Sequence, residues 1–204
     1  MTAVIEAVAP LVLFDLDGTL VDSAVDLLNA INALAAREGH APTTLERLRP
    51  VVSKGARAML AIAFTDRDEP AREALRQPFL DLYAEAISAH STPFAGIEEV
   101  LAGIEAAGAR WGIVSNKPHY LCVGVVKAMG WERRSAVLLG GDSLPQRKPD
   151  PEPLWHACAA DTPHSAQACH KGSGSGLRCG SESPPSSTAQ RSCQPIAFTT
   201  PTHR

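Results

Sequence analysis

Hydrophobic positions in the first 160 residues form short runs and helical stripes, separated by polar turns. The first clear run, Leu11–Phe14, has four apolar residues and ends at carboxylates. Such a run suits a buried central strand of a sheet. The next apolar residues recur every three or four positions, which predicts a helix closed by Gly39. The stripe of this helix consists of Ala24, Leu27, Leu28, Ile31 and Leu34.

The segment 22–90 is predicted to be almost entirely helical. Thr43 and Glu46 have the spacing of a capping box at the start of a second helix, and Pro50 limits that helix. Pro78 lies inside the last helical stretch and is expected to kink or divide it. The later helical stretches of the segment run over residues 55–64 and 71–89.

Beyond Pro93, apolar strand-like runs alternate with helical stretches. An alternation of this kind indicates a parallel sheet covered by helices. The fold class is therefore predicted to be α/β, a Rossmann-like parallel sheet with a helical insert directly after its first strand. The predicted elements are a helix at 97–107, a strand at 111–114, a helix at 119–129, a strand at 136–139 and a helix that starts after Pro151.

The composition changes abruptly near residue 160. Leu177 and Ile196 are the only Leu or Ile residues in the segment 161–204, which is rich in Ser, Thr, Pro and Gly and has no Val. Such a segment buries too little apolar surface to offset its chain entropy, so we predict that it is disordered. Its composition resembles a GC-rich gene read in the wrong frame. We therefore hypothesise a frameshifted tail, with a natural disordered tail as the alternative.

The overall composition narrows the classes of partner. The 204 residues are 45% hydrophobic, enough for one good core, and the net charge of −3 gives no reason to expect nucleic acid or an acidic membrane. The N-terminal stretch contains Glu6 and no basic region, unlike a signal peptide. No run reaches the roughly 20 apolar residues that span a bilayer. We expect a cytoplasmic protein that handles a small anion, with an oligomeric state that the sequence does not predict.

Polar clusters follow three of the predicted strands. They are Asp15–Thr19, Ser115–Lys117 and Gln146–Asp150. Ligands bind at the carboxyl ends of the strands in an open parallel sheet, so we expect the three clusters to converge on one site. Taken singly, each has a plainer interpretation: a turn with solvated acids, a helix cap and a surface lysine. Their order, each after a strand, makes the combination much more specific.

The chemistry of these clusters suits phosphoryl transfer. Of the two carboxylates, Asp15 and Asp17, one can attack phosphorus while the other exchanges a proton with the leaving and attacking oxygens. Two anions repel a phosphate, so a divalent cation is needed, and oxygen ligands suit Mg²⁺. Lys148 is placed to neutralise charge in the transition state. The predicted phosphate-binding residues are Gly18, Thr19, Ser115 and Asn116.

The same clusters carry a resemblance to a known family. FDLDGTLVDS (14–23), IVSNKP (113–118) and GGDSLPQRKPDPEPL (140–154) resemble the first three motifs of the haloacid-dehalogenase-like (HAD) phosphatase superfamily. Within it, the chain is similar to phosphoglycolate phosphatases. The run VVSKGARAML (51–60) and Trp111 also resemble the N-acetylmuramic acid 6-phosphate phosphatases, a close sister group.

The resemblance implies specific roles and a domain division. It implies an aspartyl-phosphate mechanism with Asp15 as nucleophile and Asp17 as general acid and base. Mg²⁺ would be bound by the Asp15 carboxylate and the Asp17 backbone carbonyl. The α/β core would comprise residues 1–21 and 91–160, and residues 22–90 would form a helical cap. Cap residues expected to face the substrate are Lys54, Gly55 and Arg57, with an exposed basic turn as the equally weighted alternative.

The fourth motif of the family, an acidic one that completes the metal site, is expected well beyond Lys148. The stretch 169–174 that aligns with it has no carboxylate, so the C-terminal part of the core is expected to be missing. A sheet edge left open in this way invites aggregation. The second hypothesis is therefore an inactive relative with at most a binding role. A third is a dehalogenase or a sugar-phosphate mutase, but Asp17 disfavours a dehalogenase because a halide needs no proton.

Overall fold

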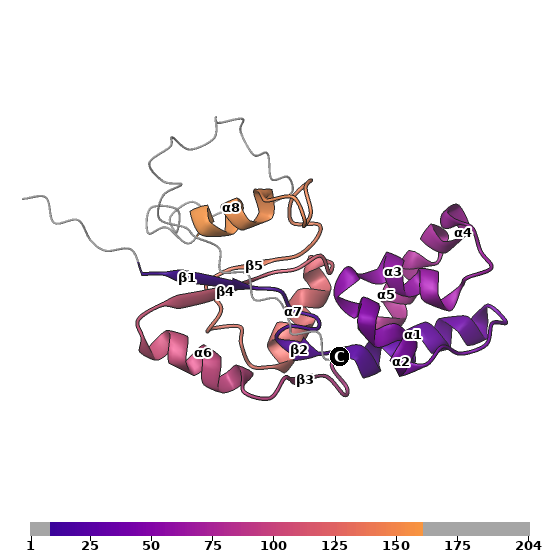
Figure 1. Ribbon diagram of the computed structural model, residues 1–204, viewed down its shortest axis with the longest axis horizontal. Coiled ribbons are helices and arrows are strands. Elements are labelled where there is room, and N and C mark those ends of the chain that lie inside the picture. Colours follow the sequence, from indigo (N-terminus) through magenta and orange to yellow (C-terminus); the bar gives the residue numbers. More distant parts are fainter. Residues whose placement is uncertain (1–8, 161–204) are drawn as a thin grey trace, which may run out of the picture.

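The structure, a computed structural model, describes residues 9–160 (Figure 1). The prediction of a disordered tail at 161–204 falls outside the described residues, as does the stretch 169–174. A three-stranded parallel sheet runs in the order β1-β4-β5. Its strands are β1 (Leu11–Phe14), β4 (Arg110–Val114) and β5 (Leu138–Leu139). The predicted α/β class is confirmed.

The first strand occupies a different place from the one its apolar run suggests. β1 lies at the edge of the sheet formed by the described residues, with Leu11 opposite Arg110 of β4. Its first three residues are only half-buried, and Phe14 alone is buried. The run was predicted to be a central strand, and this is wrong for the part of the chain that the structure covers, because no described strand pairs with the other edge of β1.

Helices cover both faces of the sheet. In Figure 1, α8 lies on one side of the sheet, whereas α6 and α7 lie on the other. The core between the sheet and α6 and α7 contains Trp111 and Trp131, whose rings meet edge to face with centroids 5.8 Å apart. The bounds are α6 (Ile97–Ala106), α7 (His119–Ala128) and α8 (Glu152–Ala160).

A separate bundle of helices, at the right of Figure 1, is inserted between β1 and β4. It has its own hydrophobic cluster, in which Ile31, Phe64 and Phe79 are fully buried, and Leu121 of α7 also packs into this cluster. The domain boundaries at residues 22 and 90 remain a prediction. The bundle and the sheet each have a hydrophobic cluster, which is consistent with such a division. The helices are α1 (Ala24–Arg37), α2 (Leu45–Leu48), the 3₁₀ helix η1 (Arg49–Lys54), α3 (Ala56–Ala63), α4 (Glu69–Ala74) and α5 (Arg76–Glu85).

The two chain segments that join the bundle to the sheet lie side by side. β2 (Val21–Asp22) pairs antiparallel with β3 (Thr92–Pro93). Next to this pair, the buried Asp26 accepts hydrogen bonds from the backbone N–H of His90 and the hydroxyl of Ser91. Burial alone would raise the pKa of Asp26, but the bonds from Ser91 and His90 outweigh it and lower this pKa. A negative charge is thus held at the junction.

The helix ends of the bundle differ from the predicted ones at two places. Thr44, not Thr43, caps α2, with its hydroxyl oxygen 3.4 Å from the N–H of Arg47. The predicted capping box at Thr43 is wrong because the Asn32 side chain bonds both the N–H and the C=O of Thr43 and holds it against α1. The stretch that contains Pro78 is divided into two helices, as predicted.

The division falls at Leu75, between α4 and α5, so that Pro78 lies in the first turn of α5. A proline is tolerated there because the N–H that it lacks would have no partner inside the helix. Gly39 closes α1 as predicted, with a left-handed φ of 71°. No helix within residues 9–160 is long and apolar enough to cross a membrane.

Candidate active site

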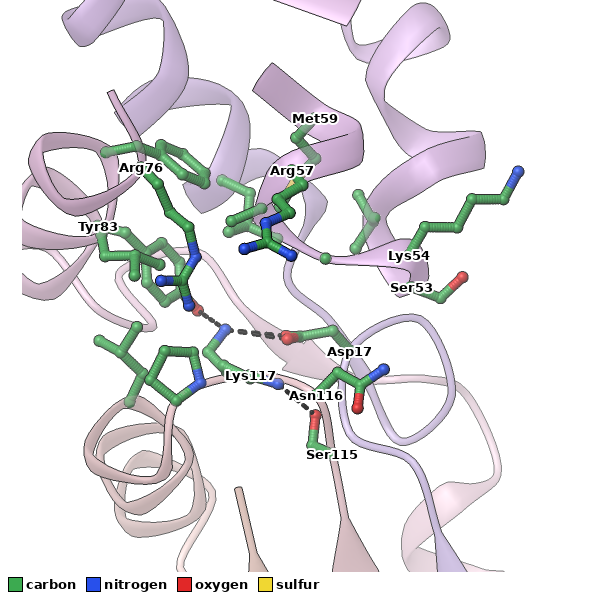
Figure 2. Close-up of a pocket in the computed structure, with 18 of the residues that line it drawn as sticks. Asp17, Ser53, Lys54, Arg57, Met59, Arg76, Tyr83, Ser115, Asn116 and Lys117 are labelled. Atoms are coloured by element: carbon green, nitrogen blue, oxygen red, sulfur yellow. Dashed lines mark hydrogen bonds and ion pairs between the residues drawn. The ribbon is translucent and has the colours of Figure 1, made fainter. Parts of the chain in front are cut away.

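A cavity of about 240 Å³ lies between the carboxyl ends of the strands and the helical bundle (Figure 2). The predicted convergence of the three polar clusters is present in the structure, because all three contribute to its walls. The core side of the cavity includes Asp15, Asp17, Ser115, Asn116, Lys117, Arg147 and Lys148. The bundle side includes Lys54, Gly55, Arg57, Arg76, Phe79 and Tyr83.

Asp15 follows the last residue of β1 and is half-buried. Its Oδ1 lies 3.0 Å from the Nζ of Lys148 and accepts a 2.8 Å hydrogen bond from the N–H of Leu16. The ion pair holds the carboxylate at a fixed place on the cavity floor. The cation sits beside the oxygen at which negative charge would build up if Asp15 attacked a phosphorus atom.

Asp17 is buried and more tightly held than Asp15. Its Oδ1 accepts a 2.6 Å hydrogen bond from the hydroxyl of Ser23, the residue that precedes α1. The Nζ of Lys117 lies 3.1 and 3.0 Å from the two carboxylate oxygens. The carboxylate therefore joins the end of β1, the first helix of the bundle and the loop after β4.

Lys117 is a buried residue of the site to which sequence reasoning gave no role. Besides Asp17, its Nζ donates to the hydroxyl of Tyr83 on α5 at 2.9 Å and lies 4.0 Å from the ring centroid. Burial alone would lower the pKa of Lys117, but the Asp17 charge and the Tyr83 hydroxyl raise it above its ordinary value. Burial raises the pKa of Tyr83 to about 12. Lys117 is therefore a cation and Tyr83 a neutral phenol near neutral pH.

The loop after β4 is held by its own side chains. The Oγ of Ser115 accepts a hydrogen bond from the N–H of Lys117 at 3.3 Å. The amide of Asn116 donates to the backbone oxygen of Lys148 at 3.0 Å, which ties the second cluster to the third. The other Asn116 side-chain atom, Oδ1, is buried and has no partner among the described residues. Such an atom needs a donor, and a bound water or a protonated ligand oxygen would supply one.

Gly18 and Thr19, both predicted to contact phosphate, do not line the cavity. Gly18 has a left-handed φ of 76°, and its N–H donates to the backbone oxygen of Val21 at 2.9 Å. The N–H of Thr19 lies 3.4 Å from the oxygen of Leu16. These backbone groups are used within the turn, so the two residues shape the chain around Asp17 instead of facing a ligand.

Two consecutive glycines let the loop after β5 approach the loop after β4. The N–H of Gly141 donates to the backbone oxygen of Lys117 at 2.8 Å. A Cβ at Gly141 would lie 2.3 Å from the backbone oxygen of Asn116, and one at Gly140 would lie 2.4 Å from the backbone of His119. These distances are too short for a side chain, so glycine is required at both positions for the loops to meet.

Replacing Gly141 by Ala is expected to destabilise the chain by about 1–3 kcal/mol, because the methyl group forces the two loops apart. Equilibrium urea unfolding followed by circular dichroism measures the change. Gly103→Ala in α6 is the matched control, because nothing lies within 4 Å of its added Cβ. The control should be neutral or slightly stabilising, since Ala favours helix. Equal stability of the two variants would contradict the close approach of the loops.

The three predicted bundle residues, Lys54, Gly55 and Arg57, all line the cavity. Lys54 is exposed and its side chain points away from Asp17 in Figure 2. Arg57 makes two hydrogen bonds to Glu73, at 2.8 and 3.0 Å. The exposed basic turn considered as the alternative thus describes Lys54 well, while Arg57 is a rim residue with a partner of its own.

The described residues match a Mg²⁺ site only in part. Mg²⁺ binds one or two carboxylates and completes its shell with waters and phosphate oxygens. Asp15 is a half-buried carboxylate on the cavity wall and fits this need, whereas the side chain of Asp17 is engaged by Lys117 and Ser23. No group of three or more His, Cys, Asp or Glu side chains is gathered within residues 9–160.

Comparisons with known proteins agree with this geometry. A family model described as haloacid dehalogenase-like hydrolase matches residues 12–169. The chain therefore belongs to the haloacid dehalogenase-like hydrolase family, and the resemblance noted in the three motifs is confirmed. A phosphoglycolate phosphatase from Xanthomonas campestris pv. campestris is 52% identical over 143 residues, which are 70% of this chain and 65% of that relative. The chain thus spans less than two thirds of the length of this relative.

One further relative and one solved structure are also similar to this chain. An N-acetylmuramic acid 6-phosphate phosphatase from Pseudomonas aeruginosa is 48% identical over 149 residues, 72% of this chain and 66% of the relative. The crystal structure of a predicted phosphoglycolate phosphatase from Haemophilus somnus is 26% identical, with a TM-score of 0.66. The match covers 76% of this chain and 72% of that protein. The fold is thus shared with phosphatases of this family.

Proposed function

We propose that the chain carries the site of a Mg²⁺-dependent phosphomonoesterase that works through an aspartyl-phosphate on Asp15. The observation that carries this proposal is the placement of Asp15 and Asp17 on one cavity wall, each with its own lysine. One carboxylate is half-buried and faces the cavity, whereas the other is buried among donors. Two acids in different surroundings suit two different roles.

In the first half-reaction, an Asp15 oxygen attacks phosphorus, a new O–P bond forms and the P–O bond to the leaving group breaks. Lys148 sits 3.0 Å from Asp15 Oδ1, where it stabilises the negative charge that spreads over the phosphoryl oxygens. The leaving oxygen takes a proton from Asp17. For this step Asp17 must exchange its contact with Lys117 for the leaving oxygen, because Lys117 contacts both carboxylate oxygens in the structure.

In the second half-reaction, water attacks the phosphorus of the aspartyl-phosphate and loses a proton to the Asp17 carboxylate. The bond between phosphorus and the Asp15 oxygen breaks, which restores the Asp15 carboxylate, leaves Asp17 protonated as at the start of the first half-reaction, and releases phosphate. The hydroxyl of Ser115 and the amide of Asn116 are neutral donors of residues that line the cavity and are proposed to hold phosphate oxygens. Mg²⁺, bound at Asp15 and the Asp17 backbone carbonyl, would offset the repulsion between the acids and the phosphate.

The first candidate substrate is 2-phosphoglycolate, which would be hydrolysed to glycolate and phosphate. The cavity of about 240 Å³ supports a small ester, since sites for drug-sized ligands begin at about 300 Å³. The second candidate is N-acetylmuramic acid 6-phosphate or another sugar phosphate, which the Pseudomonas aeruginosa relative supports by name. The small negative net charge supports a metabolite rather than nucleic acid as the partner, and we retain a cytoplasmic location as part of the proposal.

A third candidate belongs to another functional class: an inactive relative with at most a binding role. The absence of the fourth motif from the stretch 169–174 supports it. The partial Mg²⁺ donor set within the described residues points the same way. Dehalogenase chemistry is less well supported, because it gives no task to the proton on Asp17.

The direct test is to look for the covalent intermediate. The purified full-length chain is mixed with an aryl phosphate, with Mg²⁺ or with EDTA, and quenched in acid within the first turnover. We expect phosphate release only with Mg²⁺ and a mass increase of one phosphoryl group on the peptide that contains Asp15. Turnover with the phosphoryl group on another residue would refute the assigned nucleophile. No phosphate release under any condition would favour the inactive relative.

A further inference from the structure

Arg76, the first residue of α5, is a cation of the cavity wall that the proposed chemistry does not use. It is half-buried and lines the cavity, and its side chain makes no hydrogen bond or ion pair within residues 9–160. Figure 2 shows its guanidinium group pointing into the cavity, toward Lys117 and the hydroxyl of Tyr83. Among the described residues, its guanidinium group therefore lacks the anion that such groups normally bind.

The other cations on the bundle side are already accounted for. Arg57 is bound to Glu73 by two hydrogen bonds, and Lys54 is exposed and points away from Asp17 in Figure 2. The bond from Arg57 has the largest effect on Glu73 and lowers the pKa of that carboxyl, while Arg76 and Arg147 contribute only through the longer-range field of their charges. Glu73 is therefore the partner of Arg57, and Arg76 keeps its guanidinium group for a ligand.

A nearby cation and an apolar part of the wall favour an anionic ligand beside Arg76. Lys117 is a buried cation of the core side, and in Figure 2 the guanidinium group of Arg76 lies close to it, so two positive charges are near each other. Phe79 and Leu80, also on α5, are buried and form an apolar part of the wall. A ligand with an anionic group on a short carbon chain would neutralise the guanidinium group and cover this apolar surface.

The two ends of the cavity suit different anions. Asp15, Lys148 and the loop after β4 define the end at which the phosphoryl group must lie for attack. Arg76 projects from α5, on the bundle side. A planar guanidinium group binds a carboxylate through two parallel hydrogen bonds, whereas an ammonium group acts as a point charge. The bundle side is therefore better matched to a carboxylate than to a second phosphate.

We propose that Arg76 is a specificity-determining residue that binds a carboxylate of the substrate while the core side of the cavity holds its phosphate. This inference rests on the proposed function and narrows it to phosphomonoesters that also carry a carboxylic acid. It does not depend on the choice between the two candidate substrates, because both phosphoglycolate and N-acetylmuramic acid 6-phosphate are acids as well as phosphates. It also places one substrate group on each side of the cavity.

The test compares two small ligands that differ only at the group that faces Arg76. Isothermal titration with Mg²⁺ present measures the affinity for 2-phosphoglycolate and for 2-hydroxyethyl phosphate, in which a hydroxymethyl group replaces the carboxylate. All titrations use the full-length chain with Asp15→Asn, so that neither ligand is hydrolysed. We expect about 10- to 100-fold tighter binding of 2-phosphoglycolate, the usual range for a charge-assisted pair.

Arg76→Gln should reduce this preference to about twofold or less, with little change for 2-hydroxyethyl phosphate. Arg72→Gln is the matched control, because Arg72 lies one turn earlier on α4 and does not line the cavity. It should keep the full preference. A merely structural role of Arg76 would weaken both ligands equally and leave their ratio unchanged, which would overturn the proposal.

The outcomes separate this inference from the proposed function. Equal affinity of the Asp15→Asn chain for both ligands overturns the carboxylate role and leaves the phosphatase proposal standing. A preference that depends on Arg76 supports the carboxylate role even if the wild-type chain releases no phosphate, and such a result would count against the proposed activity alone. Absence of binding by both ligands overturns the two proposals together.

Discussion

Replacing Asp15 by Asn is expected to lower the turnover of an aryl phosphate by about 10⁴- to 10⁶-fold, the range seen when a nucleophile is removed. The amide cannot attack phosphorus, and Asp17, the other carboxylate of the cavity wall, is held by Lys117 and the Ser23 hydroxyl. The measurement is the initial rate of phosphate release at saturating Mg²⁺. Because Asp15 is half-buried and lies at the cavity surface, the variant should remain folded.

The control for this experiment is Asp81→Asn. Asp81 is an exposed residue of α5 that accepts a hydrogen bond from Gln77 and does not line the cavity. Its substitution removes the same charge and should leave the rate within about twofold, as expected for surface changes away from the site. A rate that survives in the Asp15 variant would show that another group attacks phosphorus, and the mechanism proposed above would be wrong.

Replacing Lys117 by Met is expected to reduce the free energy of unfolding by about 3–5 kcal/mol, the usual cost of removing one partner of a buried ion pair. The substitution leaves the buried Asp17 carboxylate without its cation and the Tyr83 hydroxyl without its donor. Urea unfolding at neutral pH measures the change. The loss should exceed that of any exposed lysine by several fold, because an exposed charge keeps its water.

Lys127→Met provides the comparison, since Lys127 is an exposed residue of α7, the helix that follows Lys117. This substitution should change the free energy of unfolding by less than about 0.5 kcal/mol. The double variant Lys117→Met with Asp17→Asn should recover part of the loss, because no unpaired charge is then buried. A Lys117 variant as stable as the Lys127 control would mean that the pair contributes little to folding. The contact between the core and α5 would then have to rest on apolar packing alone.

The elements that were read correctly from the sequence are those whose patterns are local. The stripe of α1 and its glycine stop, the strand 11–14 and the helix 119–129 were predicted to within one or two residues because periodicity and a left-handed glycine act over a few positions. The cap of α2 was misplaced by one residue. The reason is a contact with Asn32, eleven positions away, which no local pattern reports.

The predictions for the candidate site were also correct only in part. The three polar clusters were expected to converge because parallel strands end at one edge of a sheet, and the structure brings them to one cavity. The roles of Asp15, Asp17 and Lys148 remain proposals. Gly18 and Thr19 were expected to face phosphate, but their backbone groups are used inside the turn. The Ser-Asn-Lys motif did not predict that Lys117 is buried. This burial depends on a contact with Tyr83, which comes from a helix distant in the sequence.

The sequence by itself determined the α/β class, the family and the residues able to take part in phosphoryl transfer, because these depend on periodicity and on motifs of a few adjacent residues. Only the tertiary structure decided which of those residues face one another. Asp17 and Lys117 are separated by 100 positions and lie 3.0 Å apart, and Arg76 enters the cavity from a helix that the motifs do not include. Contacts of this range depend on how the helices pack on the sheet, and a short sequence pattern carries no information about that packing.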